Sequence, residues 1–187
     1  MIPSFFQRLI LACSLTLGVS VVQAASQADL VAALSKSKLT LADGIRQATS
    51  DGEAALSAKF EFDDQGKLSL SVYAAKNGVS VMAKENVLEE LSGSPEESPW
   101  KPEVEVFKDS PHVARSSQQL RLMSHTRLSL LDLIEKAQAA QRGIVFSITP
   151  KLKGSRPVAV VLVADGPKVA ELTYALSDGK LVNTRRP

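Results

Sequence analysis

Cysteine, histidine and aromatic residues are scarce in this 187-residue sequence, which has one Cys, two His and 5% Phe, Trp and Tyr together. Cys13 lies in the apolar N-terminal stretch, so the chain after it has no thiol for a disulfide, a nucleophile or a metal site. His112 and His125 belong to no His-Glu-x-x-His pattern, which argues against a zinc centre. We therefore expect no metal and no cofactor.

An excess of charge of either sign is also lacking, because 22 Lys and Arg face 20 Asp and Glu and leave a net charge of +2. With a single Trp for base stacking as well, the sequence predicts no nucleic-acid binding. An apolar share of 44% excludes a wholly disordered chain. The length suits one medium domain or two small ones, and the composition indicates a soluble protein with helices and strands.

Residues 1–24 have the pattern of a secretory signal peptide: a basic start, an apolar run from Leu9 to Val22, and small residues before a cut after Ala24. The alternative of a membrane anchor needs about 20 apolar residues, more than this run supplies. A lipoprotein signal would need a longer apolar stretch before Cys13. We expect a periplasmic protein with no membrane anchor after cleavage, secretion being the alternative, and a mature chain that begins at Ala25.

The chain contains an internal repeat, because Leu39–Ala48 aligns without a gap on Leu128–Ala137 with five identical positions. In each copy a hydroxyl residue, Thr40 or Ser129, is followed three residues later by an aspartate. This is the capping-box pattern of a helix start. Apolar residues then recur at helical spacing, so each copy predicts a short amphipathic helix.

Alternating apolar and polar residues after each helix predict three antiparallel strands, with Asn77-Gly78 as one of the hairpin turns. The expected fold class is α+β, with two repeats that each pack one helix on a three-stranded antiparallel β-meander. The expected strands are 58–63, 68–74 and 79–82 in the first repeat, and 144–149, 157–164 and 169–176 in the second, which runs on into 181–182.

The predicted boundaries are 25–91 for the first repeat and 125–187 for the second. Residues 92–124 form a linker and connecting segment, since 92–102 is rich in Ser, Pro and Glu. Within this segment, 104–107 has the pattern of a strand. The rest is either a helix or an ordered connection.

The helix-plus-meander repeat, closed by Ser177–Val182, resembles the PepSY domain. The resemblance implies a protein without catalytic activity or cofactor. Members of that family occur as propeptides of secreted metallopeptidases, which they inhibit or help to fold, and as stand-alone periplasmic proteins.

The run from Val158 to Val163 is continuously apolar, so both faces of this strand need cover. The far face must be covered by the other repeat, by residues 104–123 or by another subunit. We hypothesise that the second repeat's sheet carries the contact surface, through its edge or through an incompletely covered face.

We therefore predict a non-catalytic module that binds a protein or peptide, with a peptidase as one candidate partner, through a strand edge or sheet face. The predicted contact residues are Val158, Val160, Leu162, Arg185 and Arg186. The alternatives are a small-ligand carrier or enzyme with a pocket between the repeats, and a structural homo-oligomer such as a homodimer.

Overall fold

A computed structural model describes residues 26–186, so the predicted signal peptide, 1–24, and its cleavage site lie outside the described residues. Within these residues, two α-helices followed by four strands occur twice. The elements are α1 (Gln27–Ala33), η1 (Leu34–Lys36), α2 (Leu41–Ala48), β1 (Ala54–Phe62), β2 (Leu68–Ala75), η2 (Ala83–Glu85), β3 (Leu88–Gly93), β4 (Glu103–Val106), α3 (Ser110–Ser124), α4 (Leu130–Ala140), β5 (Ile144–Lys153), β6 (Arg156–Asp165), β7 (Lys168–Ala175) and β8 (Leu181–Arg185).

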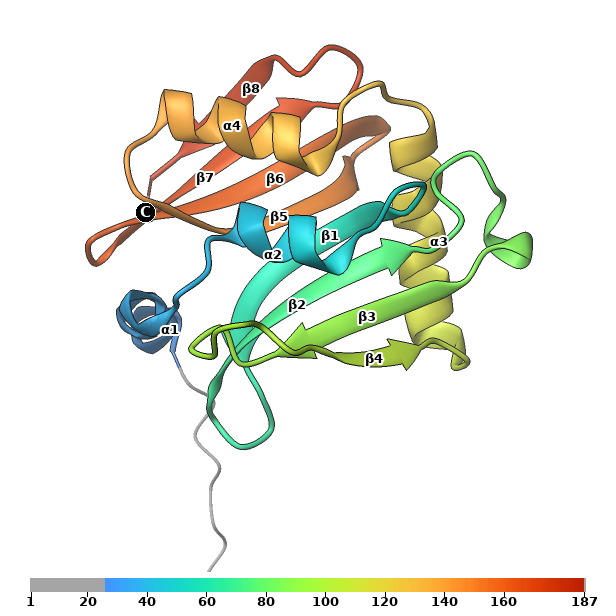
Figure 1. Ribbon diagram of the computed structural model, residues 1–187. Helices are drawn as coiled ribbons and strands as arrows, with labels where there is room; N and C mark the ends of the chain where they lie inside the picture. Colours follow the sequence, from blue (N-terminus) through green and yellow to red (C-terminus); the bar gives the residue numbers. More distant parts are fainter. Residues whose placement is uncertain (1–25, 187) are drawn as a thin grey trace, which may run out of the picture.

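The strands of the described chain form one eight-stranded sheet in the order β4-β3-β2-β1-β5-β6-β7-β8 (Figure 1). Every neighbouring pair is antiparallel. The first four and the last four strands each form a meander, and the two meanders meet where β1 lies beside β5. Ala58 pairs with Ile148 there, and Lys59 pairs with Ser147.

The predicted fold of two repeats, each with one helix on a three-stranded meander, is wrong. Each half contributes two helices and four strands, and both halves share one sheet. The pairing of β1 with β5 and of β3 with β4, which joins all strands into one sheet, links segments that local periodicity does not relate.

One error concerns 79–82, which forms a loop rather than the predicted strand. The side-chain amide of Asn86 donates to the carbonyl oxygens of Gly78 at 2.8 Å and Val81 at 3.1 Å. Its oxygen accepts the backbone N–H of Asn77 at 2.9 Å. These bonds satisfy the backbone within the loop, so the third strand begins later, as β3.

Residues 92–102, which were predicted to be a linker, contain the end of β3 and a loop that is held against the body of the protein. Lys38 donates its backbone N–H to the carbonyl oxygen of Pro95 at 2.8 Å, and the Trp100 side chain is buried in the core. This anchoring carries the chain back to the sheet, where β4 pairs with β3.

The predicted helix starts are confirmed. The Thr40 hydroxyl accepts the backbone N–H of Asp43 at 3.1 Å, and the carboxylate of Asp43 accepts the N–H of Thr40. Ser129 and Asp132 form the same reciprocal pair at the start of α4. Both helices therefore begin where a local capping box stabilises the free N–H groups.

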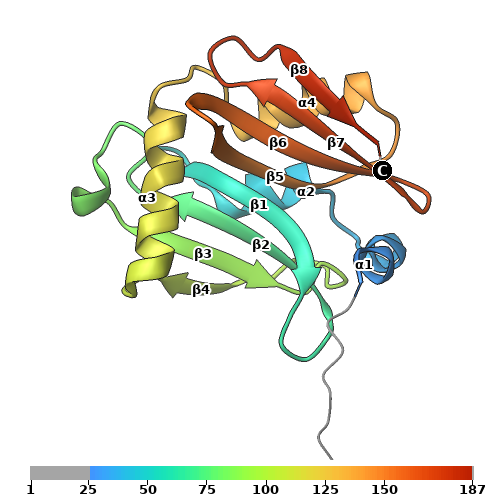
Figure 2. The ribbon, with the colours of Figure 1, turned by 180° about the vertical axis from the view of Figure 1, so that it is seen from behind.

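The helices cover the two faces of the sheet unequally. Helices α2 and α4 lie on one face and α3 crosses the other (Figures 1 and 2). A Cβ added at Gly44 of α2 would lie 2.2 Å from Cδ2 of Leu70, which shows how closely α2 approaches β2. On the opposite face, the Ser57 hydroxyl donates to Oε1 of Gln119 in α3 at 3.1 Å. Helix α3 packs on β1, β2, β3 and β5 and so spans both meanders.

The apolar core is one continuous cluster that draws on both halves. Its fully buried members include Leu70 and Val72 from the first meander and Leu133, Ile148 and Val161 from the second half. A shared core joins the halves even though the β1–β5 ladder is short.

Candidate functional site

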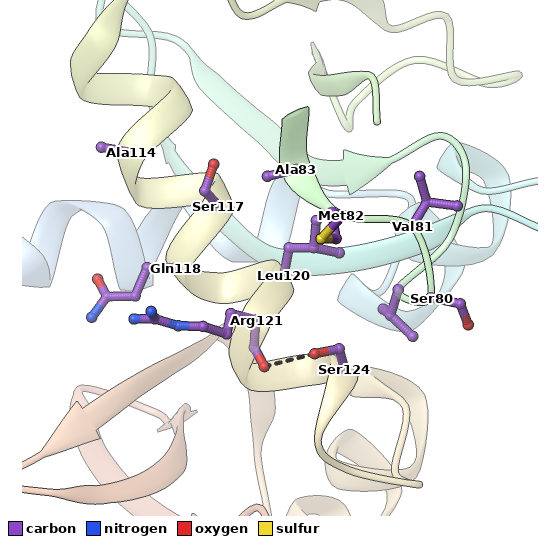
Figure 3. A pocket seen from close by; sticks show the side chains of 11 residues that line it. Ser80, Val81, Met82, Ala83, Ala114, Ser117, Gln118, Leu120, Arg121 and Ser124 are labelled. Carbon is purple, nitrogen blue, oxygen red and sulfur yellow. Dashed lines mark hydrogen bonds between the residues drawn. The ribbon is translucent and has the colours of Figure 1, made fainter. Parts of the chain in front are cut away.

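A hollow of the described chain lies between the loop at 79–83 and helix α3 (Figure 3). We call it the α3 groove. Its volume is about 640 Å³. The side-chain bonds of Asn86 described above hold its loop wall in place, and α3 forms the other wall.

Side chains of α3 reach the groove at helical spacing, so they share one side of the helix. Leu120 is buried and forms the floor, while Gln118 and Arg121 are exposed at the rim. The α3 side chains that line the groove are Ala114, Ser117, Gln118, Leu120, Arg121 and Ser124.

The opposite wall is mainly apolar and comes from Val79, Ser80, Val81, Met82 and Ala83. Met82 is 58% exposed, a large exposure for an unbranched apolar side chain. Figure 3 shows Met82 beside Leu120 on the loop side of α3, while the side chains of Gln118 and Arg121 extend from the helix away from that loop. The groove therefore joins an apolar wall to a polar rim.

The charge of α3 is one-sided. From Ser110 to Ser124 the helix carries Arg115 and Arg121 and no acidic residue. Arg121 lines the groove at its edge, and its guanidinium can donate two parallel hydrogen bonds to a carboxylate. The site thus has the chemistry to hold an apolar group next to an anionic one.

Three of the five predicted contact residues, Val158, Val160 and Leu162, lie on β6. They alternate along the strand with residues that point to the face of the sheet covered by α4. Strand pairing places these three side chains on the face that α3 crosses. Val158 and Val160 are buried and Leu162 is partly buried. None of the three lines the α3 groove.

The other two predicted contact residues lie at the far edge of the sheet. Arg185 donates to the carboxylate of Glu171 at 2.9 Å, and Arg186 donates to Oε1 of Gln141 at 3.0 Å. The structure therefore separates the basic tail from the groove.

The α3 groove was missed at the level of sequence. The weak sequence signal was the spacing of small and polar residues from Ala114 to Ser124. This spacing indicates a groove only when the loop at 79–83 lies beside the helix. Residues 79–82 were predicted to be a strand, so that neighbour was not foreseen.

Two further hollows flank the junction of the two meanders. The larger, about 720 Å³, lies beside α1 and β1 and contains the ion pair between Lys59 and Glu61. The smaller, about 340 Å³, is lined by Ile45 of α2 and by Met123 and residues 126–131 of the second half. Residues of both halves line this smaller hollow, which is the location expected for a pocket between the repeats.

The aspartates with altered acidity serve local structure. Hydrogen bonds from Thr40, chiefly from its hydroxyl, lower the pKa of Asp43. The backbone N–H of Ser129 is the main cause that lowers the pKa of Asp132. Within residues 26–186, no three His, Asp or Glu side chains stand close enough to form a metal site.

Comparison with known proteins gives little. No family model matches the chain, and no curated protein matches it. A solved structure of a "putative lipoprotein" from Clostridium difficile 630 is similar, with 12% identity and a TM-score of 0.41 over 80% of this chain and 94% of the other. The helices between residues 26 and 186 include none that is long and apolar enough to cross a membrane. The resemblance to the PepSY domain stays a prediction.

Proposed function

We propose that this chain is an exported, periplasmic binding protein without catalytic activity, and that it holds an extended segment of a partner protein in the α3 groove. The observation that carries the proposal is the groove itself, with its exposed apolar wall and its basic rim. A peptidase is the partner class that the PepSY resemblance suggests.

The energetics favour a segment with a large apolar side chain. Met82 is 58% exposed in the free protein, so covering it contributes roughly half of the ~1.5–3 kcal/mol that full burial of such a side chain gives. Val79 and Val81, both partly exposed, extend the same apolar surface. A bound apolar side chain would therefore remove surface from water on both partners.

The rim favours an acidic residue next to that apolar side chain. Arg121 offers a charged donor, and Gln118 offers an amide for backbone groups of an extended segment. The proposed ligand is thus an extended peptide with an apolar anchor followed or preceded by a carboxylate.

A selection from random displayed peptides, followed by fluorescence polarisation with the selected sequences, tests this function. Ala114→Trp fills the groove and should weaken binding at least about tenfold, a loss of about 1.4 kcal/mol. Ala140→Trp on α4 is the matched control, because both alanines are exposed and helical, and it should bind as the wild type does.

Arg121→Gln tests the rim separately. It should weaken binding of peptides with an acidic residue and leave peptides without one unchanged. Equal affinities for the Ala114→Trp and Ala140→Trp variants, or a selection that yields no peptide, would reject the proposed function.

A further inference from the structure

A second surface, separate from the α3 groove, is formed by the two edges of the sheet. Strands β4 and β8 end the strand order, so within residues 26–186 each is paired on one side only. Val104 of β4 and Val182 of β8 are 58% and 56% exposed. Open edges with exposed apolar residues can pair with a strand of another chain.

The two halves of the molecule carry opposite charge. Residues 26–109 contain 15 acidic and 9 basic side chains, whereas residues 110–187 contain 5 acidic and 12 basic ones. The halves therefore have net charges of −6 and +7, which the overall charge of +2 conceals. Because the first half ends in β4 and the second in β8, the two edges belong to halves of opposite sign.

The charge difference extends to the edge strands themselves. β4 carries Glu103 and Glu105, both exposed, and β8 ends in Arg185 followed by Arg186. Pairing of β4 with β4 would bring carboxylates together, and pairing of β8 with β8 would bring guanidinium groups together. Like charges directly opposite are destabilising, so the edges favour each other over themselves.

The faces also agree. Followed across the ladders of the sheet, the pairs place Glu103, Glu105 and Arg185 on the same face, the one that α3 crosses. Residues directly opposite in a ladder share a face. An antiparallel ladder with Glu103 opposite Arg185 then also sets Val106 opposite Val182.

We propose that the partner of the sheet edges is a second copy of this chain, with β4 of one copy paired to β8 of the next. The contact joins two different surfaces, so in a dimer each copy still has one free edge. Such a contact generates a ring if the rotation closes and a linear assembly if it does not.

Sedimentation velocity of the mature chain at low and high salt is the first test. Association should be strong in about 20 mM NaCl and weaken at least tenfold in about 500 mM NaCl, where the screening length is only a few ångströms. Glu103→Arg/Glu105→Arg and Arg185→Glu/Arg186→Glu should each be monomeric alone and associate when mixed. Circular dichroism confirms that each variant folds.

The register is tested with cysteines, since the mature chain has none of its own. Copies with Val104→Cys and copies with Thr184→Cys should form a mixed disulfide-linked dimer on oxidation. Asn183→Cys is the matched control, because its side chain lies on the other face and should not react with Val104→Cys. A monomer at low salt, or a mixture of charge variants that stays monomeric, overturns the proposal.

Discussion

Three helices of this protein begin with the same local arrangement, a hydroxyl residue followed three positions later by an aspartate that bonds back to it. The hydroxyl accepts a free backbone N–H of the first turn, and the carboxylate accepts the N–H of the hydroxyl residue. All partners lie within four residues, so each start is encoded locally, although only the two in the repeated segments were predicted. The pairs are Ser26 with Asp29, Thr40 with Asp43, and Ser129 with Asp132.

Removing either cap hydroxyl should destabilise the fold. Thr40→Ala and Ser129→Ala should each lower the free energy of unfolding by about 0.5–2 kcal/mol, because a backbone N–H in the first turn loses its acceptor. Urea denaturation measures the loss. Ser155→Ala, at an exposed turn, is the control and should change stability little. Unchanged unfolding free energies in Thr40→Ala and Ser129→Ala would show that tertiary packing alone fixes these helix starts.

The cap aspartates should make stability depend on pH. Asp43 and Asp132 have a pKa lowered from the ordinary value of 3.8 in the folded protein, so their contribution is fully present above that value. It is lost as the pH falls through the lowered folded pKa. Unfolding free energies from pH 6 to pH 2 should fall less steeply at the acid end in Asp43→Asn/Asp132→Asn than in the wild type. Parallel curves would contradict this assignment.

Helices and strands that depend on local sequence were predicted well. Both capped helices are confirmed, and expected strands such as 68–74 and 157–164 match β2 and β6. The loop at 79–83 was mistaken for a strand because Asn77-Gly78 is a typical hairpin turn, and the bonding of Asn86 nine residues later outweighs it. The joining of β1 to β5 and the position of α3 depend on packing between distant segments. The α3 groove depends on both and was therefore not predictable.

At Gly143, between α4 and β5, the backbone comes very close to the backbone of β6. Its φ is +130°, and an added Cβ would lie 2.2 Å from the carbonyl oxygen of Ala164 in β6. Backbone cannot move aside as a side-chain end can. The glycine therefore lets the chain leaving α4 run directly against β6.

Gly143→Ala should cost about 3 kcal/mol or more, since backbone strain and a backbone clash add. Gly154→Ala is the matched control: it also has a positive φ, +63°, but nothing lies within 4 Å of an added Cβ. It should cost only about 1–2 kcal/mol, the strain alone. Thermal melts of both variants measure the difference. Equal losses would show that the contact with Ala164 relaxes freely.

At the scale of the whole molecule, two similar halves are joined into one sheet and one core while their charges remain separate. The β1–β5 ladder has two residue pairs, but the core cluster and α3 cross the junction. The apolar contacts therefore bind the halves far more strongly than the ladder alone. This arrangement predicts that neither half unfolds without the other.

Ile148→Ala tests the joint directly, because Ile148 is fully buried and pairs with Ala58 across the junction. Truncating such a side chain costs about 2–5 kcal/mol. Fluorescence of Trp100 reports on the first half, and hydrogen exchange at core amides such as that of Leu172 reports on the second. Both should shift by the same free energy, although the substitution lies in the second half. Val182→Ala, on an exposed edge, should move neither probe much. A Trp100 transition that stays in place while the second half loses protection would show that the halves unfold independently, because a single cooperative core must lose stability as a whole.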